Sequence, residues 1–226
     1  MSQIFFDDTY IAVIPTYENA VAHKHSMLHV FLGKEPLTLG NNARGNMIIL
    51  EQNVVHQSPK GNLLFFLLVD PTSEFASKIR SEYLKGNDSF ASDISVDQLD
   101  VTEQGIKKFV KGTFGEACFI RRKDIDERIA SLLESIDCFE QMESKIPHIA
   151  QQMHYSESYL SHLFKKETGV SIKKYLLLRR VEYVWKKVLS GENITNAALI
   201  AGFSSSSHFS DTCKELTGIS VTGVLR

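Results

Sequence analysis

Four of the chain's eight histidines lie near its start, at His23, His25, His29 and His56. The side chains of a strand alternate between its two faces, so the first three, which are all odd-numbered, would share one face. His56 could join them from a neighbouring strand, and clusters of imidazole suit zinc, nickel, iron or copper. The pattern is therefore compatible with a metal site. The same four side chains could instead line a metal-free effector pocket, or lie exposed without a common role.

The second set of residues that could do chemistry lies in a phrase that occurs twice. FKKETGVS begins at Phe164, and CKELTGIS begins forty-nine residues later at Cys213. The sequences that lead into the two phrases also correspond. Each copy has the pattern of a helix, a tight turn and a second helix. We therefore predict two helix-turn-helix units, over about residues 146–169 and 195–218.

Capping residues set the predicted limits of these helices. Ser156 can accept hydrogen bonds from the free amides of a first helical turn, and Thr195 can do so in the second copy. Gly169 and Gly218 can adopt the left-handed conformation that ends a helix. Between the copies, residues 171–189 have a helical spacing of apolar residues, enough for about five turns. One rigid helix would hold both units at a fixed separation, which suits major-groove segments about 34 Å apart.

Charge is distributed unevenly over the chain. The formal net charge is −2, but residues 145–190 hold nine Lys or Arg against three acidic residues, a local charge of +6. Residues 191–226 hold two basic and three acidic residues, a local charge of −1. The basic charge therefore lies over the first helix-turn-helix unit and the connecting helix, where it could contact DNA phosphates.

Membrane and secretory signals are not evident in the sequence. No apolar run reaches the roughly 18 residues of a spanning helix, and the start lacks the basic and apolar regions of a signal peptide. The three cysteines, Cys118, Cys138 and Cys213, are odd in number and widely separated, which argues against a disulfide framework. We expect a cytoplasmic protein with reduced thiols.

The front of the chain predicts strands followed by helices. Four apolar runs of strand length, TYIAVI, MLHVFLG, NMIILE and LLFFLLV, are separated by turn-forming residues. Residues 73–86 and 101–112 have a helical period, and either could present an apolar face to a second copy of the chain. The polar residues 86–98 predict a loop. From Asp124 onward the pattern is helical.

The chain from about Ile125 to Arg226 resembles the DNA-binding domain of AraC/XylS-type transcriptional regulators. The residues that carry the resemblance form one ordered series. They are Ile149, Ala150, Ser156, Tyr159, Leu160, Leu163, Phe164, Lys165, Gly169, Ser171, Tyr175 and Arg180, followed by Ile194, Ala198, Gly202, Phe203, Ser207, Phe209, Lys214, Gly218 and Ser220. Such a series is far more specific than a lone helix-turn-helix. The resemblance implies sequence-specific DNA binding in the regulation of transcription.

The resemblance and the helical phase assign the residues that would face DNA. Base contacts are expected at Ser158, Ser161, His162, Ser206, Ser207, His208 and Asp211. Phosphate contacts are expected at Lys165, Lys166, Lys173, Lys174, Arg179 and Lys214, whereas Arg180 could be a structural anchor. Asp211 stands where the family often has arginine, and an acid repels phosphate. We therefore predict that the second unit binds more weakly than the first.

The segments that hold the four front histidines resemble the cupin barrel that many regulators of this family carry as a sensor. The cupin pattern has a His-x-His pair, a third ligand about four residues on, and a fourth histidine on a later strand. His29 takes the place normally held by Glu. The resemblance implies a site for an effector or a metal at His23, His25, His29 and His56. Sensor barrels of this family generally bind no metal, so we expect no cofactor, with a transition metal as the alternative.

The sequence thus predicts a multidomain regulator, not an enzyme. An all-β cupin-like barrel is expected over residues 1–72, a helical or linker region with dimerisation helices over 73–123, and an all-α DNA-binding domain over 124–226. Expected partners are double-stranded DNA, a small-molecule effector and RNA polymerase; a homodimer is expected, and no membrane. Two other hypotheses stay open: a metal-dependent cupin enzyme with an appended DNA-binding module, and an architectural DNA binder without sequence specificity.

Overall fold

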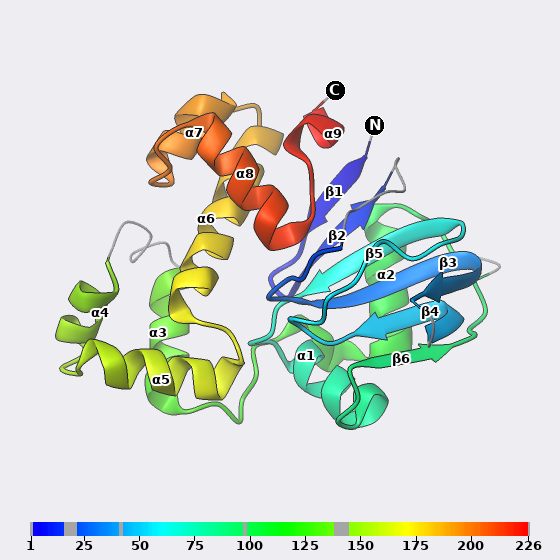
Figure 1. Ribbon diagram of the computed structural model, residues 1–226, viewed down its shortest axis with the longest axis horizontal. Coiled ribbons are helices and arrows are strands. Elements are labelled where there is room, and N and C mark those ends of the chain that lie inside the picture. The colour runs from blue at the N-terminus through cyan, green and yellow to red at the C-terminus, as the bar shows by residue number, and fades with distance from the viewer. Residues whose placement is uncertain (1, 16–21, 41–42, 97–98, 138–144, 226) are drawn as a thin grey trace. The chain divides into compact units, whose positions relative to one another are not determined.

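The computed structural model of the protein describes residues 2–15, 22–40, 43–96, 99–137 and 145–225. The chain divides into two compact units (Figure 1). The first comprises Met1–Lys123 together with Thr217–Arg226, and the second comprises Asp124–Leu216. The division after Lys123 coincides with the expected start of the DNA-binding domain, but the last ten residues group with the first unit. Cys138 lies outside the described residues.

The first unit is built on a six-stranded antiparallel sheet in the order β1-β2-β5-β3-β4-β6 (Figure 1). The strands are β1 (Gln3–Phe6), β2 (Tyr10–Ile14), β3 (Leu28–Leu39), β4 (Ala43–Leu50), β5 (Leu63–Val69) and β6 (Ser89–Ser92). The four predicted strands correspond to β2, β3, β4 and β5. The prediction of a loop over residues 86–98 is wrong in part, because β6 lies there and pairs with β4.

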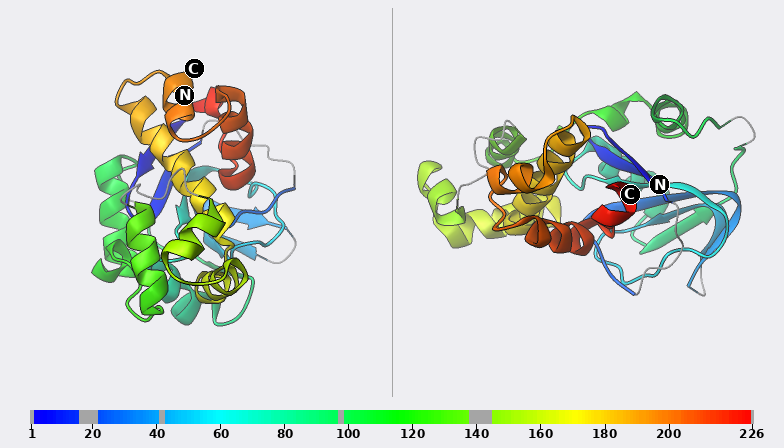
Figure 2. Two further views of the ribbon diagram at one scale, coloured as in Figure 1. Left: turned by 90° about the vertical axis from the view of Figure 1, so that its left-hand side faces the viewer. Right: turned by 90° about the horizontal axis from the view of Figure 1, so that it is seen from above.

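Alternate side chains of the sheet enter two separate cores. Val30 and Leu67 point to the face that is covered by helices, whereas Phe31 belongs to a smaller cluster on the opposite face. The covering helices are α1 (Glu74–Lys78), its π-helical continuation η1 (Ile79–Leu84), α2 (Glu103–Phe114) and the short η2 (Glu116–Phe119) (Figures 1 and 2). Since side chains alternate along β3, His29 lies on the face of Phe31, away from these helices.

The two segments expected to supply a dimer face bury their apolar residues within their own unit. In residues 73–86 these are Phe75, Ala76, Ile79 and Leu84, and in residues 101–112 they are Ile106 and Val110. Their apolar stripes cover the sheet, so they are not available to a second copy of the chain. The expectation that these segments present an exposed apolar face is therefore not met, and homodimerisation stays a prediction.

The second unit is helical in its described residues. Its helices are α3 (Glu127–Asp137), α4 (Ile146–Gln152), α5 (Glu157–Thr168), α6 (Ile172–Leu189), α7 (Ile194–Ile200) and α8 (Ser206–Thr217), and α9 (Val221–Leu225) follows in the C-terminal segment. Helices α3, α4 and α5 share a core with the start of α6. Further along α6, Trp185 packs edge-on against Phe209 of α8 and donates its indole hydrogen bond to the Cys213 sulfur at 3.2 Å. No helix in the described part of the chain is long and apolar enough to cross a membrane.

Candidate DNA interface and histidine cluster

The two predicted helix-turn-helix units repeat the same backbone geometry. In the turn of the first unit, the Tyr155 amide donates to the Ala150 carbonyl at 2.8 Å. In the second unit the Phe203 amide donates to the Ala198 carbonyl at 2.9 Å. The residue before each donor has a positive φ, 58° in the first turn and 81° in the second. The repeat in the sequence is therefore a repeat of structure, with α4 and α5 in one unit and α7 and α8 in the other.

Local hydrogen bonds set the ends of these helices. The Ser156 hydroxyl accepts from the Tyr159 amide at 3.2 Å at the start of α5, as predicted. Gly169 ends α5 with a left-handed φ of 74°, which is also as predicted. The cap of α7 is Asn193, whose side chain accepts from the next two free amides, so the prediction of Thr195 was wrong. Asparagine at this position offers the same acceptor with a longer reach.

The outer face of α5 carries polar side chains that do not take part in the core. Ser158, His162, Lys165 and Lys166 are exposed, and Ser161 is half-buried. On the inner face, Leu160 and Phe164 are fully buried. A helix with one apolar and one polar face of this kind can lie in a major groove and place short side chains against base edges.

The outer face of α8 carries the corresponding set from the second unit. Ser207, His208 and Asp211 are exposed, and Ser206 is half-buried. The His208 Nδ1 lies 3.4 Å from the Ser204 amide, which donates to it. Neutral His208 therefore carries its proton on Nε2 and presents a hydrogen-bond donor to solvent. Such a donor suits the acceptors of guanine or the O4 atom of thymine in the major groove.

Most of the residues expected to contact phosphates are exposed, but one is not. Lys165, Lys166, Lys173, Lys174 and Lys214 are exposed. Arg179 is 8% exposed and donates from Nε to Asp137 at 2.8 Å and from Nη1 to Glu182 at 2.6 Å. A guanidinium that is held by two carboxylates in the interior cannot reach a phosphate. The expected phosphate contact at Arg179 is therefore wrong, because Arg179 anchors α6 to α3 instead. The anchoring role suggested for Arg180 stays a prediction.

Arg128 was not predicted from the sequence as a functional residue, although it contacts Tyr159 of α5. Its Nη1 donates to the Tyr159 hydroxyl at 2.6 Å, and its guanidinium lies 5.9 Å from the centre of the Tyr155 ring. Asp126 accepts two hydrogen bonds from the same guanidinium, which lowers the pKa of Asp126 to about 2. The sequence signal that could have identified this cluster is Arg128 itself, a basic residue that directly follows acidic residues at the start of a predicted helix. The cluster joins α3 to the N-terminal turn of α5.

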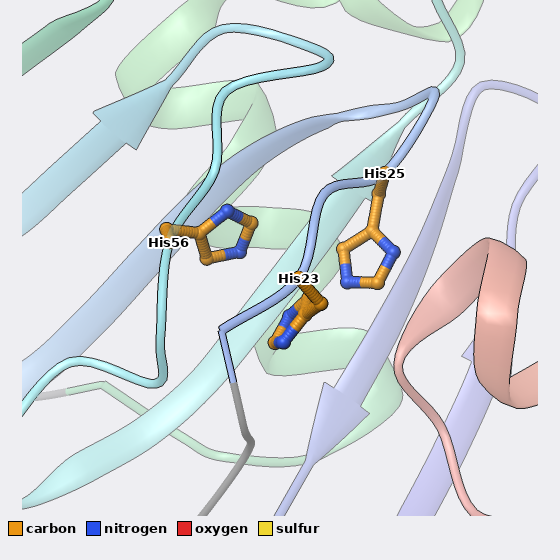
Figure 3. Close-up of side chains that lie close together, drawn as sticks. All are labelled: His23, His25 and His56. Atoms are coloured by element: carbon orange, nitrogen blue, oxygen red, sulfur yellow. The ribbon is translucent and has the colours of Figure 1, made fainter.

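The structure brings the four front histidines together on the sheet face opposite α1 and α2, and Figure 3 shows three of them, His23, His25 and His56. His23 and His25 precede β3, His29 lies within it, and His56 follows β4. The rings of His23 and His25 are 4.4 Å apart, those of His23 and His56 are 4.6 Å apart, and those of His29 and His56 are 4.7 Å apart, between centroids. Of the four histidines, only His29 lies on a strand. The predicted alternation of side chains along a strand therefore accounts for His29, but not for His23 and His25, which precede β3.

Backbone hydrogen bonds hold the segments of this cluster in place. The His23 amide donates to the His56 carbonyl at 2.9 Å, and the His56 amide donates back to the His23 carbonyl at 2.8 Å. The Asn53 amide donates to the His25 carbonyl at 2.7 Å. These bonds join the loop after β4 to the segment before β3. The pairing of His23 with His56 is an isolated bridge and does not extend into a ladder.

Burial favours the neutral imidazole at two positions of this cluster, His29 and His56. His25, His29 and His56 are 3%, 2% and 8% exposed. Desolvation lowers the pKa of His29 well below its ordinary value, and the neighbouring histidines lower it further. Desolvation also lowers the pKa of His56, which a hydrogen bond to the Val54 carbonyl partly opposes. Neutral imidazole is the form that binds metals and accepts hydrogen bonds.

A cavity of about 230 Å³ opens beside the histidines. All four histidines line it together with apolar side chains that include Val13, Phe31, Leu63 and Phe66. The cavity wall combines these apolar side chains with polar groups, among them the four imidazoles, and a concave wall with convergent polar groups can hold a small molecule. The cavity therefore offers two kinds of contact, an apolar surface and a group of ring nitrogens.

Comparison with known proteins agrees with the helical repeat. A family model described as a helix-turn-helix domain matches residues 149–226. No curated protein sequence matches the chain. Among solved structures, the C-terminal domain of AraT, a response regulator from Geobacillus stearothermophilus, is 25% identical with a TM-score of 0.40. The match covers 43% of this chain and 83% of that one.

Two further solved structures are similar to different extents of the chain. A protein of unknown function from Listeria innocua is 27% identical over 41% of this chain and 89% of its own, with a TM-score of 0.37. ToxT from Vibrio cholerae, bound to (E)-4-(8-methylnaphthalen-1-yl)but-3-enoic acid, is 16% identical with a TM-score of 0.51. That match covers 98% of this chain and 97% of ToxT, so the likeness extends to the fold of the whole chain.

Proposed function

We propose that the chain is a DNA-binding transcription regulator of the AraC type, and that its two helix-turn-helix units read successive major-groove segments of one operator. The helix-turn-helix family model that matches residues 149–226 supports this proposal. The observation that carries this proposal is the structural repeat of α4–α5 in α7–α8, with a polar outer face on both α5 and α8. The 18-residue helix α6 joins the two units and would set the spacing of the groove segments.

Specific reading is proposed for the outer faces of α5 and α8. His162 and His208 are the largest side chains among the proposed base contacts, and each can bond to one base edge. The serines beside them can read bases directly or through water. The exposed lysines Lys165, Lys166, Lys173, Lys174 and Lys214 are proposed to contact phosphates and to fix the register of the helices on the duplex.

Effector sensing is proposed for the first unit. The cavity beside the histidine cluster supports this part of the proposal, because apolar side chains and convergent ring nitrogens line it together. We propose a regulator without catalytic activity that acts in the cytoplasm, where an operator would be accessible. Homodimerisation and a contact with RNA polymerase stay predictions. Both helices expected to supply a dimer face are packed on their own sheet, so a dimer would use another surface.

The test of the proposal separates base contacts from phosphate contacts in the full-length protein. An operator is first selected from random duplex DNA, and affinities are then measured for the operator and for unrelated DNA. The His162→Ala variant should lower the ratio of the two affinities about tenfold, because one base contact is worth about 1–3 kcal/mol. The Lys165→Glu variant should weaken binding to both DNAs by a similar factor, because a phosphate contact carries no sequence information.

The matched control is Lys108→Glu, which reverses the charge of an exposed lysine on α2 in the first unit. It should leave both affinities unchanged. If selection yields no preferred sequence, the chain binds DNA without specificity and the architectural hypothesis is favoured. If His162→Ala and Lys165→Glu change the two affinities in the same way, the assignment of base and phosphate contacts is wrong.

A further inference from the structure

We propose that His23, His25 and His56 bind a first-row transition metal ion of the zinc type through three imidazole nitrogens. The inference rests on the proposed function only for its role, as the signal that the first unit would sense. The binding itself is independent of DNA. The three ring nitrogens that can act as ligands lie within 4.8 Å of one another, and Figure 3 shows the three rings around a common space.

The donor set selects the class of metal. A tetrahedral zinc site with zinc–nitrogen distances of about 2.0–2.1 Å places its nitrogen ligands about 3.4 Å apart. The rings would therefore each move by about 1 Å to close on an ion, which side-chain rotation can supply. The group contains no carboxylate, whereas calcium and magnesium require oxygen ligands. Three imidazoles suit zinc, cobalt, nickel and copper.

The His56 ring is already oriented as a ligand. Its Nδ1 lies 2.9 Å from the Val54 carbonyl oxygen. A carbonyl oxygen can only accept, so Nδ1 carries the proton and Nε2 keeps its lone pair for a metal. Histidines that bind metals commonly donate their other ring N–H to a backbone carbonyl in this way, which fixes the tautomer and the ring.

The backbone places two ligand segments beside each other without a metal. His23 and His56 are joined by two reciprocal backbone hydrogen bonds, of 2.9 and 2.8 Å. The loop that contains His56 is joined to His25 by the Asn53 amide. The three ligands are therefore held close together by the fold, and binding would not need to order these segments. Such preorganisation raises affinity because less entropy is lost when the ion binds.

His29 supplies a second observation that points to a bound species. Its Nδ1 is buried and has no hydrogen-bond partner among the described residues. Its ring stacks on Phe31 at 5.2 Å and lies 5.0 Å from the His25 ring, between centroids. A buried polar atom that has lost its water without gaining a hydrogen-bond partner is unfavourable. Three protein ligands leave a coordination position for water, and a metal-bound water is a donor that could satisfy such an atom. His29 is therefore assigned beside the metal and not to its ligands.

The experiment uses full-length protein without a histidine tag, stripped with a chelator and titrated with Co²⁺ as the probe. We expect one equivalent to bind and to give the visible absorption of a site with nitrogen ligands, and Zn²⁺ to displace it. Native mass spectrometry would count the bound ion. The variants His23→Ala and His56→Ala should each bind Co²⁺ at least about tenfold more weakly. His148→Ala is the matched control, since His148 is exposed on α4 of the second unit, and it should bind like the unaltered chain.

Folding is monitored separately from binding. The conservative variant His56→Gln should keep the thermal unfolding midpoint of the metal-free protein and lose the rise in midpoint that Co²⁺ causes in the unaltered chain. Absence of Co²⁺ uptake at one equivalent would overturn the proposal. So would equal uptake by the unaltered chain and by a variant with His23, His25 and His56 all changed to Ala. Neither result depends on DNA binding, so failure of the metal site would leave the proposed regulator intact.

Discussion

At the scale of single residues, Arg179 shows how much one side chain can organise. Its guanidinium bonds to Asp137 at the end of α3 and to Glu182 one turn along α6. The three side chains are 9%, 26% and 9% exposed, so the ion pairs are mostly removed from water. Losing the cation would leave two carboxylates without their counter-charge. The cost of breaking such a pair exceeds its net contribution, because the remaining charges stay desolvated.

The Arg179→Ala variant should therefore destabilise the second unit by about 3 kcal/mol. The chain has a single tryptophan, Trp185, and it lies in this unit. Urea unfolding followed by its fluorescence thus reports on the second unit specifically. Lys173→Ala, an exposed residue on the same helix, is the control and should change the free energy of unfolding by less than about 0.5 kcal/mol. An Arg179→Ala protein as stable as the control would show that Arg179 is not an anchor.

The same residue marks a limit of prediction from sequence. Arg179 and Arg180 are adjacent on α6, so their side chains differ in direction by about 100°. The apolar period does not decide which of the two turns inward, because both border the buried face. The deciding partner, Asp137, is 42 residues away in sequence and is brought near only by the packing of α3 on α6. The exposed lysines were easier to place, since they lie opposite a clear apolar stripe.

At the scale of elements, α2 contains two glycines in opposite surroundings. A Cβ atom at Gly105 would lie 1.9 Å from the Asp100 carbonyl oxygen, which is far inside contact distance. A Cβ atom at Gly112 would meet nothing within 4 Å. Neither glycine has a positive φ, so the backbone itself accepts alanine at both positions. Only glycine fits at Gly105, where the backbone of Asp100 comes close to α2. Nothing near the exposed Gly112 requires a glycine there.

The same substitution should accordingly have opposite signs at the two positions. Gly112→Ala should stabilise the protein by about 0.5–1 kcal/mol, because alanine loses less conformational entropy in a helix. Gly105→Ala should destabilise it by about 1–3 kcal/mol, because the chain at Asp100 must move. Differential scanning calorimetry of the full-length variants would measure both effects. Shifts of the same sign in the two variants would contradict the geometry at the start of α2.

Elements defined by local chemistry were predictable, and those defined by distant contacts were not. Ser156 and Gly169 act through atoms within one turn, so their types alone marked the limits of α5. The strand β6 has four half-buried residues and exists because β4 offers it an edge. Its own sequence has too few apolar residues to predict a strand. The histidine cluster lies between these cases, since its spacing was readable but its assembly depends on the pairing of His23 with His56.

At the scale of the whole molecule, the net charge of −2 conceals an arrangement suited to DNA. The basic side chains of α5 and the first turn of α6 are exposed, and the described acids nearest to Arg179 are neutralised by it. Ion pairs on the first unit, such as Lys107 with Asp7 at 3.2 Å, involve other lysines. Binding should therefore be governed by the local positive surface and not by the average charge of the chain.

This local control predicts the salt dependence of binding. Each lysine that neutralises a phosphate releases a counterion from DNA, so the logarithm of the affinity should fall linearly with the logarithm of salt concentration. Changing Lys173 and Lys174 together to Ala should reduce the magnitude of that slope by about 2. Changing Lys108 to Ala alters the net charge without altering the proposed interface, and should leave the slope unchanged. The measurement is a series of fluorescence-anisotropy titrations of full-length protein with operator DNA at increasing salt. If the slope is flat in the unaltered chain, phosphate contacts do not drive binding. If Lys108→Ala lowers the slope by as much per charge removed as the Lys173 and Lys174 double variant does, the average charge of the molecule governs binding. The exposed lysines of α5 and α6 would then have no special role.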